Sequence, residues 1–180
     1  MKNLLVVGGT GFIGFHIIKK AKKKKFTISS ISLHNPKKHR LHKDVNYIKV
    51  DIADLRSLNN KLKNISIDYV INAGGYGEHP DFGTKGTKLI KSHLYGTINL
   101  LQIVKKKKIK KFIQIGSSAE YGKVKSPIHE STECLPNTPY AIAKISCTNI
   151  ILSLCRNKEF PATIFRLFQD LCPLGSICLS

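Results

Sequence analysis

The sequence predicts an α/β fold of the doubly wound type, in which a parallel sheet carries helices on both faces. Two observations predict this fold. Expected strands alternate with expected helices along the whole chain, and a glycine-rich loop follows the first expected strand. Alternation of this kind gives a parallel sheet, because right-handed crossover connections lay the helices over its faces.

The expected elements follow from short apolar runs and from helical periodicity. Residues 3–7 form a continuous apolar run, which is typical of a strand buried on both faces. Asp54 stands where an N-cap residue would begin a helix. The predicted strands are 3–7, 26–33, 47–50, 67–72, 111–116 and 162–168, and the predicted helices are 12–24, 54–62, 85–106 and 138–156.

Length and composition indicate a globular chain. The 180 residues suffice for one domain with one core, and 42% hydrophobic with 23% charged residues is usual for this class. No apolar run is long enough to cross a bilayer, and the 5 cysteines lack metal-ligand spacing. We therefore expect a cytoplasmic protein with reduced thiols, no metal site and no membrane contact. We place one domain over residues 1–169 and a divergent tail over 170–180.

The net charge of +19 raises the question of a nucleic-acid partner. Lysines concentrate in residues 19–25 and 105–111, each at the end of an expected helix. There they lie beside the negative end of the helix dipole, and no aromatic side chains are interleaved for base stacking. We therefore expect solvated helix ends and no nucleic-acid partner. Attraction of an acidic substrate would be an additional effect.

The glycine loop, GGTGFIG at residues 8–14, carries the first functional prediction. Gly8 permits a tight turn, Gly11 lets the backbone approach a pyrophosphate, and Gly14 lets the helix pack close to the sheet. The pyrophosphate would lie against free N–H groups at the start of the helix. A glycine-rich turn without a ligand is the alternative, but the position between an apolar strand and a helix favours a Rossmann-type dinucleotide site. The expected cofactor-binding residues here are Gly8, Thr10, Gly11, Phe12, Ile13 and Gly14.

The end of the second strand bears on the choice between NAD and NADP. A carboxylate there would bond the 2′-hydroxyl of the adenosine ribose, but Ser32 stands in its place. Lys37, Lys38 and Arg40 follow. These residues slightly favour NADP, and a lysine-rich surface loop with no role in phosphate binding explains them almost as well. The predicted cofactor is therefore NAD or NADP.

Several separated motifs match one family when they are taken in order. They are GGTGFIG at 8–14, VDIAD at 50–54, INAGG at 71–75, GTINLL at 96–101, IGSSAEYG at 115–122, PYAIAK at 139–144 and RLFQ at 166–169. With them the chain resembles the extended short-chain dehydrogenases/reductases, specifically the NAD(P)-dependent nucleotide-sugar epimerase/dehydratase group. The resemblance runs from Leu4 to about Phe168.

The resemblance implies a role for particular residues. Asp51 would lie beside the adenine amino group with Ile52 packed nearby. The cofactor cleft after the fourth strand would be lined by Asn72, Ala73 and Gly74. Tyr140 and Lys144 form the family's YxxxK pair, and they would both catalyse and bind the cofactor. Ser117, four residues before Tyr121, is the expected catalytic serine, with Ser118 as the alternative if the alignment is off by one.

The chemistry of these residue types agrees with such roles. Tyr140 and Lys144 are four residues apart and share one face of a helix. An ammonium near a phenol favours the phenolate, so we expect Lys144 to lower the pKa of Tyr140. Ser117 would bond the reacting oxygen. The alternative, a half-buried tyrosine beside a solvated lysine, would be preferred without the other motifs.

The chain also departs from the family pattern. The dehydratases carry an acid pair after the catalytic residue, whereas here Ala119 replaces the first acid and Glu120 directly precedes Tyr121. This favours an epimerase or a 4-keto reductase over a dehydratase. His93 replaces a structural asparagine of the long helix, which we interpret as a packing substitution. The family continues beyond Gln169 into a substrate-binding domain, and we expect that domain to be largely missing here.

Two functions therefore remain open. The first is NAD(P)-dependent conversion of a nucleotide-activated sugar by transient hydride transfer at a sugar carbon, with a nucleotide sugar as the substrate partner. The second is a catalytically inactive NAD(P)-binding fragment or regulatory module. The resemblance also implies a homodimer formed through the helices at 85–106 and 138–156.

Overall fold

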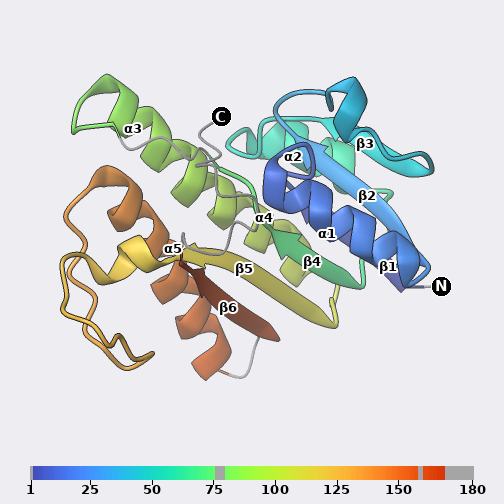
Figure 1. Cartoon of the computed structure of the whole chain (residues 1–180). Coiled ribbons are helices and arrows are strands. Elements are labelled where there is room, and N and C mark those ends of the chain that lie inside the picture. Colours follow the sequence, from blue (N-terminus) through green and yellow to red (C-terminus); the bar gives the residue numbers. More distant parts are fainter. Residues whose placement is uncertain (1, 76–79, 158–159, 169–180) are drawn as a thin grey trace.

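The computed structural model describes residues 2–75, 80–157 and 160–168 and contains one six-stranded parallel sheet (Figure 1). The predicted tail at 170–180 and Gln169 lie outside the described residues. The strand order is β3-β2-β1-β4-β5-β6. The strands are β1 (Lys2–Val7), β2 (Phe26–Ser32), β3 (Val45–Lys49), β4 (Tyr69–Asn72), β5 (Lys111–Ser117) and β6 (Ala162–Leu167).

The strand order reverses at β1, because β2 and β3 follow on one side of it and β4, β5 and β6 on the other. β1 pairs on one side with β2, up to Val7 opposite Ile31, and on the other side with β4, where Val7 lies opposite Asn72. All of these pairings are parallel, so the carboxyl ends of the strands meet at one edge. In open α/β sheets a ligand binds in the crevice beyond such a switch point.

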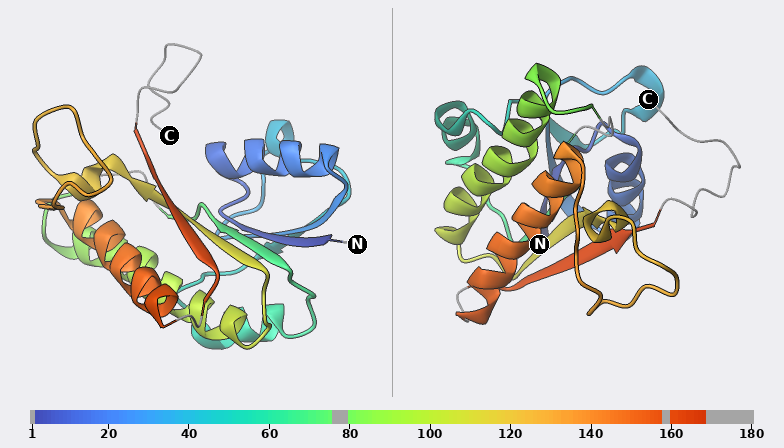
Figure 2. Two further views of the ribbon diagram at one scale, coloured as in Figure 1. Left: turned by 90° about the horizontal axis from the view of Figure 1, so that it is seen from below. Right: turned by 90° about the vertical axis from the view of Figure 1, so that its left-hand side faces the viewer.

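Helices cover both faces of the sheet, as predicted (Figure 2). One face carries α1 alone, and the other carries α2, α4 and α5. The helices are α1 (Phe12–Lys23), α2 (Leu55–Leu62), α3 (Thr84–Ile90), η2 (Lys91–Tyr95), α4 (Gly96–Lys105) and α5 (Pro139–Arg156), with short 3-10 turns at η1 (Lys38–Arg40) and η3 (Ser118–Tyr121). No helix among these described segments is long and apolar enough to span a bilayer.

Two apolar clusters hold the layers together. The larger one packs α2, α4 and α5 on the sheet around fully buried side chains such as Leu58, Leu100 and Phe112. The smaller one lies under α1 and includes Ile18 and Ile28. Burial of apolar surface is the main stabilising contribution of both clusters.

The predicted elements are confirmed, with shifts of about two residues at some ends and one difference inside a helix. Asp54 caps α2 as expected, since its Oδ1 accepts a hydrogen bond from the backbone N–H of Ser57 at 3.0 Å. The helix predicted over 85–106 is interrupted, because η2 is a π-helical segment between α3 and α4. A π segment shifts the facing of the following residues, and such segments are frequent at functional sites.

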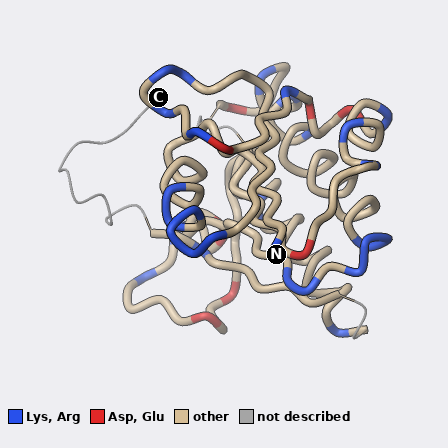
Figure 3. The backbone as a smooth tube through the Cα atoms, turned by 90° about the vertical axis from the view of Figure 1, so that its right-hand side faces the viewer, with Lys and Arg blue, Asp and Glu red and all other residues tan. Residues whose placement is uncertain are grey.

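The basic residues occupy helix ends and loops around the molecule (Figure 3). Lys20, Lys22 and Lys23 lie in the last turn of α1, and Lys105 lies in the last turn of α4. Both positions place positive charge at the negative end of a helix dipole. The absence of a nucleic-acid partner stays a prediction.

Candidate active site

The glycine loop joins β1 to α1 at the switch point of the sheet. Gly8 has a φ of +75°, and a Cβ there would lie 2.7 Å from the backbone oxygen of Ala73. A Cβ at Gly14 would lie 2.2 Å from the backbone oxygen of Gly8. Both glycines are therefore required by close backbone contacts, Gly8 with the segment after β4 and Gly14 within the loop.

Gly11 differs from these two glycines because an added Cβ would meet a single neighbouring atom, in a tight but not clashing contact. Its nearest heavy atom to an added Cβ would be the oxygen of Gly8 at 3.3 Å, and its φ of −76° suits any residue. Gly11 is the N-cap of α1, no side chain caps this end, and the first turn contains no acid. The space and the uncapped N–H groups fit a pyrophosphate.

The end of β4 forms the neighbouring wall of the crevice. Asn72 is buried, and its amide nitrogen donates to Gln114 Oε1 at 2.9 Å and to Thr97 Oγ1 at 3.3 Å. Its Oδ1 accepts from the N–H of Gly74 at 3.2 Å. Asn72 thus fixes the path of the chain through Ala73 and Gly74 with a side chain that is fully engaged inside the protein.

The two residues expected near the adenine lie after β3. Asp51 is exposed and accepts a hydrogen bond from the N–H of Ala53 at 2.9 Å, which shapes the turn before α2. Ile52 is partly buried and packs against Gly96, where an added Cβ would lie 2.5 Å from its side chain.

A basic side chain lies beside the glycine loop. Ser32 Oγ accepts a hydrogen bond from the N–H of Thr10 at 3.4 Å. Arg40 Nη1 donates to the carbonyl oxygen of Thr10 at 3.3 Å. The guanidinium of Arg40 therefore lies next to the place where a carboxylate would select NAD.

The structure brings Ser117, Tyr140 and Lys144 together. Ser117 ends β5 and lies within hydrogen-bonding reach of the Tyr140 phenol, a bond that lowers the pKa of Tyr140. Thr138 caps α5 by accepting from the N–H of Ala141 at 3.1 Å, and it thereby fixes the start of the helix that presents Tyr140. Lys144 Nζ lies 5.6 Å from the centroid of the Tyr140 ring.

The geometry does not agree with the expectation that the pKa of Tyr140 is lowered. Burial raises the pKa of Tyr140, and the charge of Glu120 raises it further against the hydrogen bond from Ser117. Lys144 Nζ donates to the backbone oxygen of Ile115 at 3.0 Å and lies over the ring instead of at the hydroxyl. Burial lowers the pKa of Lys144 itself. The prediction that Lys144 lowers the pKa of Tyr140 is therefore wrong for the protein alone.

His93 lies in the π segment η2 and packs into the same site. Its side chain is buried and meets the Tyr140 ring edge-on, with centroids 5.5 Å apart. A Cβ at Gly75 would lie 1.9 Å from the His93 ring, so the glycine makes room for it. His93 is buried directly against Tyr140, and its interpretation as a packing substitution stays a prediction.

Sequence reasoning missed the partners of Glu120. This carboxylate is fully buried, and its Oε2 lies 2.9 Å from Arg166 Nε on β6. Oε2 also accepts from Thr148 Oγ1 on α5 at 2.9 Å, and Oε1 accepts from the N–H of Ser117 at 2.9 Å. The position of Glu120 directly before Tyr121 was the available signal, but spacing alone does not show a partner 46 residues away.

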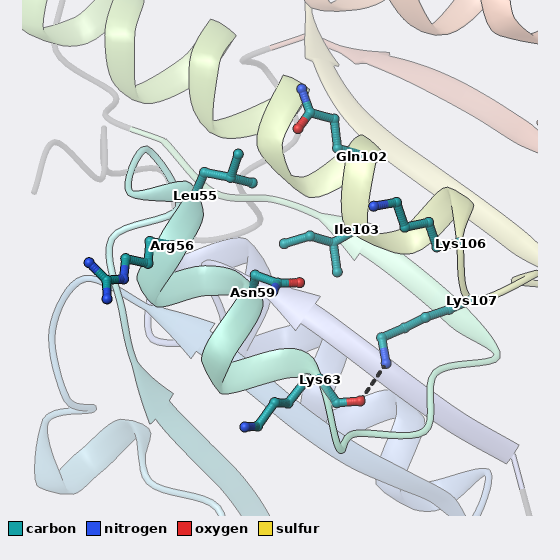
Figure 4. Close-up of a pocket in the computed structure, with 8 residues that line it drawn as sticks. All are labelled: Leu55, Arg56, Asn59, Lys63, Gln102, Ile103, Lys106 and Lys107. Atoms are coloured by element: carbon teal, nitrogen blue, oxygen red, sulfur yellow. Dashed lines mark hydrogen bonds between the residues drawn. The ribbon is translucent and has the colours of Figure 1, made fainter.

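Two grooves are present among the described residues, and only the second one includes predicted site residues, Phe12 and Ile13. A basic groove between α2 and α4 contains none of the predicted site residues (Figure 4). Its lining consists of Leu55, Arg56, Asn59, Lys63, Gln102, Ile103, Lys106 and Lys107. A second, mainly apolar groove runs between α1 and the strands β1, β4 and β5, and Phe12, Ile13 and Ile71 contribute to it. Within the described ranges, no cluster of His, Cys, Asp and Glu is placed to hold a metal ion.

Comparison with known proteins agrees with this geometry. Residues 4–174 match the NAD dependent epimerase/dehydratase family, and the chain belongs to that family. A UDP-glucose 4-epimerase of Lactobacillus helveticus is 27% identical over 168 residues, which are 92% of this chain and 51% of that protein. The chain spans about a quarter to a half of the length of the relatives that it matches.

Solved structures show the same fold. The UDP-glucose 4-epimerase of Thermotoga maritima with UDP-glucose superposes with a TM-score of 0.82 at 25% identity, over 91% of this chain and 54% of that one. The UDP-glucose 4-epimerase of Brucella ovis in complex with NAD gives a TM-score of 0.84 at 22% identity, over 94% and 52% of the two chains.

Proposed function

We propose that this chain binds NAD or NADP at the glycine loop and acts as a nucleotide-sugar epimerase, over a domain that spans residues 1–169. The observation that carries the proposal is the meeting of Ser117, Tyr140 and Lys144 at the sheet edge that also holds the glycine loop. Family membership and the epimerases with bound UDP-glucose or NAD support it.

Tyr140, Ser117 and Lys144 each have a role that follows from their position in the site. Tyr140 takes the proton from a sugar hydroxyl as its carbon is oxidised and returns it on reduction. Ser117 holds the sugar oxygen against the phenol, since its own hydroxyl already reaches Tyr140. A nicotinamide bound beside these residues would supply reversible hydride transfer at the same carbon. Lys144 lies over the ring of Tyr140 and is bonded to the carbonyl oxygen of Ile115, and the family resemblance also assigns it a bond to the cofactor ribose.

The burial of Glu120 favours epimerisation or keto reduction over dehydration. A dehydratase requires an acid that reaches the sugar, whereas Glu120 is fully buried and bonded to Arg166 and Thr148. Among the cofactors, the position of Arg40 beside Thr10 favours NADP, because a guanidinium can pair with a 2′-phosphate. A cytoplasmic location and a homodimer stay predictions.

An NAD(P)-binding module without catalytic activity is the second candidate. The observation that favours it is the burial of Tyr140, which raises the pKa of its phenol and so disfavours the phenolate that would act as a base. In that case the glycine loop binds the dinucleotide and no nucleotide sugar is converted.

A turnover assay separates the two candidates. The purified chain is incubated with NAD or NADP and a panel of nucleotide sugars that begins with UDP-glucose, and the products are separated by chromatography. We expect epimerised sugar from the wild type and none from Tyr140→Phe, with equal cofactor binding in both. Cofactor binding without product from any sugar would favour the module, and equal turnover in Tyr140→Phe would remove Tyr140 from its role.

A further inference from the structure

Glu120 connects three elements of the candidate active site through one buried carboxylate. Its Oε1 accepts from the N–H of Ser117 at the end of β5, at 2.9 Å. Its Oε2 accepts from Thr148 on α5 and from Arg166 on β6, both at 2.9 Å. The carboxylate has no exposed surface, so its acceptor positions serve the protein alone.

The contacts of Glu120 reach the elements that carry the catalytic side chains. Thr148 lies one turn after Lys144 and two turns after Tyr140, so the three residues share one face of α5. The backbone N–H of Ser117 donates to the same carboxylate. The chain leaves room for this arrangement at Gly116, where a Cβ would lie 2.6 Å from Glu120 Oε1.

The charge of Glu120 is balanced by Arg166, whose side chain is 19% exposed. Arg166 Nη1 also donates to the Tyr121 hydroxyl at 3.0 Å, and its guanidinium lies 4.8 Å from the centre of that ring. Arg166 is therefore held in place by two neighbouring residues of η3. A buried ion pair by itself is weak evidence for stability, so stability alone does not explain why Glu120 and Arg166 are paired here.

We propose that Glu120 is a positioning residue: paired with Arg166, it fixes Ser117 relative to the face of α5 that presents Tyr140 and Lys144. The proposal rests on the proposed function of that trio. In this role the Glu120 carboxylate aligns Ser117 and contributes the negative charge near the Tyr140 phenol. Through Arg166, strand β6 is connected directly with the site.

The charge of Glu120 is felt at Tyr140, where it raises the pKa after the larger effect of burial. Glutamine at this position keeps an oxygen that can accept from the Ser117 N–H but removes the negative charge. It also leaves the positive charge of Arg166 without its partner. Both changes favour the phenolate. The described titratable groups near Tyr140 are Glu120 on η3, His93 on η2 and Lys144 on α5.

The test is a pH titration of Tyr140 in the full chain. Tyrosinate absorbance is recorded against pH, and the curve of Tyr140→Phe in the same background is subtracted. For Glu120→Gln we expect the midpoint to move to lower pH by about half a unit or more. For Arg166→Met, which leaves the carboxylate uncompensated, we expect a move to higher pH. Glu133→Gln, which removes an exposed carboxylate, should leave the midpoint unchanged.

An unchanged midpoint in folded Glu120→Gln and Arg166→Met would overturn the proposal and leave a purely structural ion pair. If Glu120→Gln does not fold, the double variant E120Q/R166M, which leaves no lone buried charge, is compared with Arg166→Met, and we expect its midpoint at lower pH because the two differ only in the charge of residue 120. The titration needs no turnover, so its result is independent of the proposed function, which the turnover assay with nucleotide sugars tests. Where turnover is measurable, we expect Glu120→Gln to lower kcat with little change in KM.

Discussion

Lys144 lies one helical turn after Tyr140, and its Nζ is 5.6 Å from the centroid of the Tyr140 ring while it donates to the carbonyl oxygen of Ile115. The lysine thus joins the catalytic helix to β5 through one hydrogen bond of 3.0 Å. Its near-complete burial is unusual for this residue type and has a measurable consequence for stability.

Lys144 is expected to make the stability of the fold depend on pH. Burial lowers the pKa of Lys144 below the ordinary value of 10.5. Between the lowered value and 10.5, the unfolded chain binds more protons than the folded chain, so the free energy of unfolding rises with pH. The rise is at most about 1.4 kcal/mol per pH unit for one group.

The measurement is urea unfolding of the wild type and Lys144→Met across this pH range. We expect the free energy of unfolding of Lys144→Met not to rise with pH in this range. In Lys88→Met, which changes an exposed position of α3, we expect the same rise as in the wild type. A rise of equal size in the wild type and Lys144→Met would show that Lys144 is not the group responsible.

Arg40 is expected to select for NADP. Its guanidinium lies beside Thr10, so Arg40→Ala should weaken binding of NADP about tenfold while changing binding of NAD little. Lys43→Ala removes an exposed cation from the turn before β3, outside this group of basic residues, and serves as the matched control. Fluorescence titration with the two reduced cofactors measures both affinities, and an equal loss for NAD and NADP would contradict a role in phosphate recognition.

Gly14 is expected to be essential for folding of the loop. A Cβ there would lie 2.2 Å from the oxygen of Gly8 and 2.6 Å from the Cα of Gly9, and neither backbone atom can move away easily. We expect Gly14→Ala to lower the free energy of unfolding by about 2 kcal/mol. Thermal and urea unfolding measure the loss, and wild-type stability would show that the helix does not pack this closely.

The sheet and the glycine loop could be predicted because local signals determine them. The alternation of apolar strands and helices predicts the topology, and Asp54 is the N-cap residue at which α2 begins. The spacing of the glycines agrees with the close contacts found at Gly8 and Gly14. These features depend on residues close in sequence, and the physical reason for each is visible in the sequence.

The interior of the site could not be predicted in the same way. The apolar pattern of the helix predicted over 85–106 gives no sign of the π segment that contains His93. The pairing of Glu120 with Arg166 joins residues from different strands and turns, and it depends on the tertiary fold. The pKa of Tyr140 was predicted from its neighbour in sequence, whereas burial, the largest cause, determines the direction of its shift.

The central claim is that the open space at Gly11 holds the pyrophosphate of a nicotinamide dinucleotide. Gly11 has an extended backbone, and an added Cβ would meet only the oxygen of Gly8 at 3.3 Å. Gly11→Ala should therefore cost less than about 1 kcal/mol of stability while it fills the space that the phosphates need.

Isothermal titration of the purified chain with NAD and NADP tests this claim most directly, with the wild type and Gly11→Ala measured side by side and their folding checked by circular dichroism. We expect saturable binding of at least one dinucleotide to the wild type and a loss of at least about tenfold in affinity in the folded variant. No saturable binding of either dinucleotide to the wild type, or equal binding by both proteins, would contradict the account.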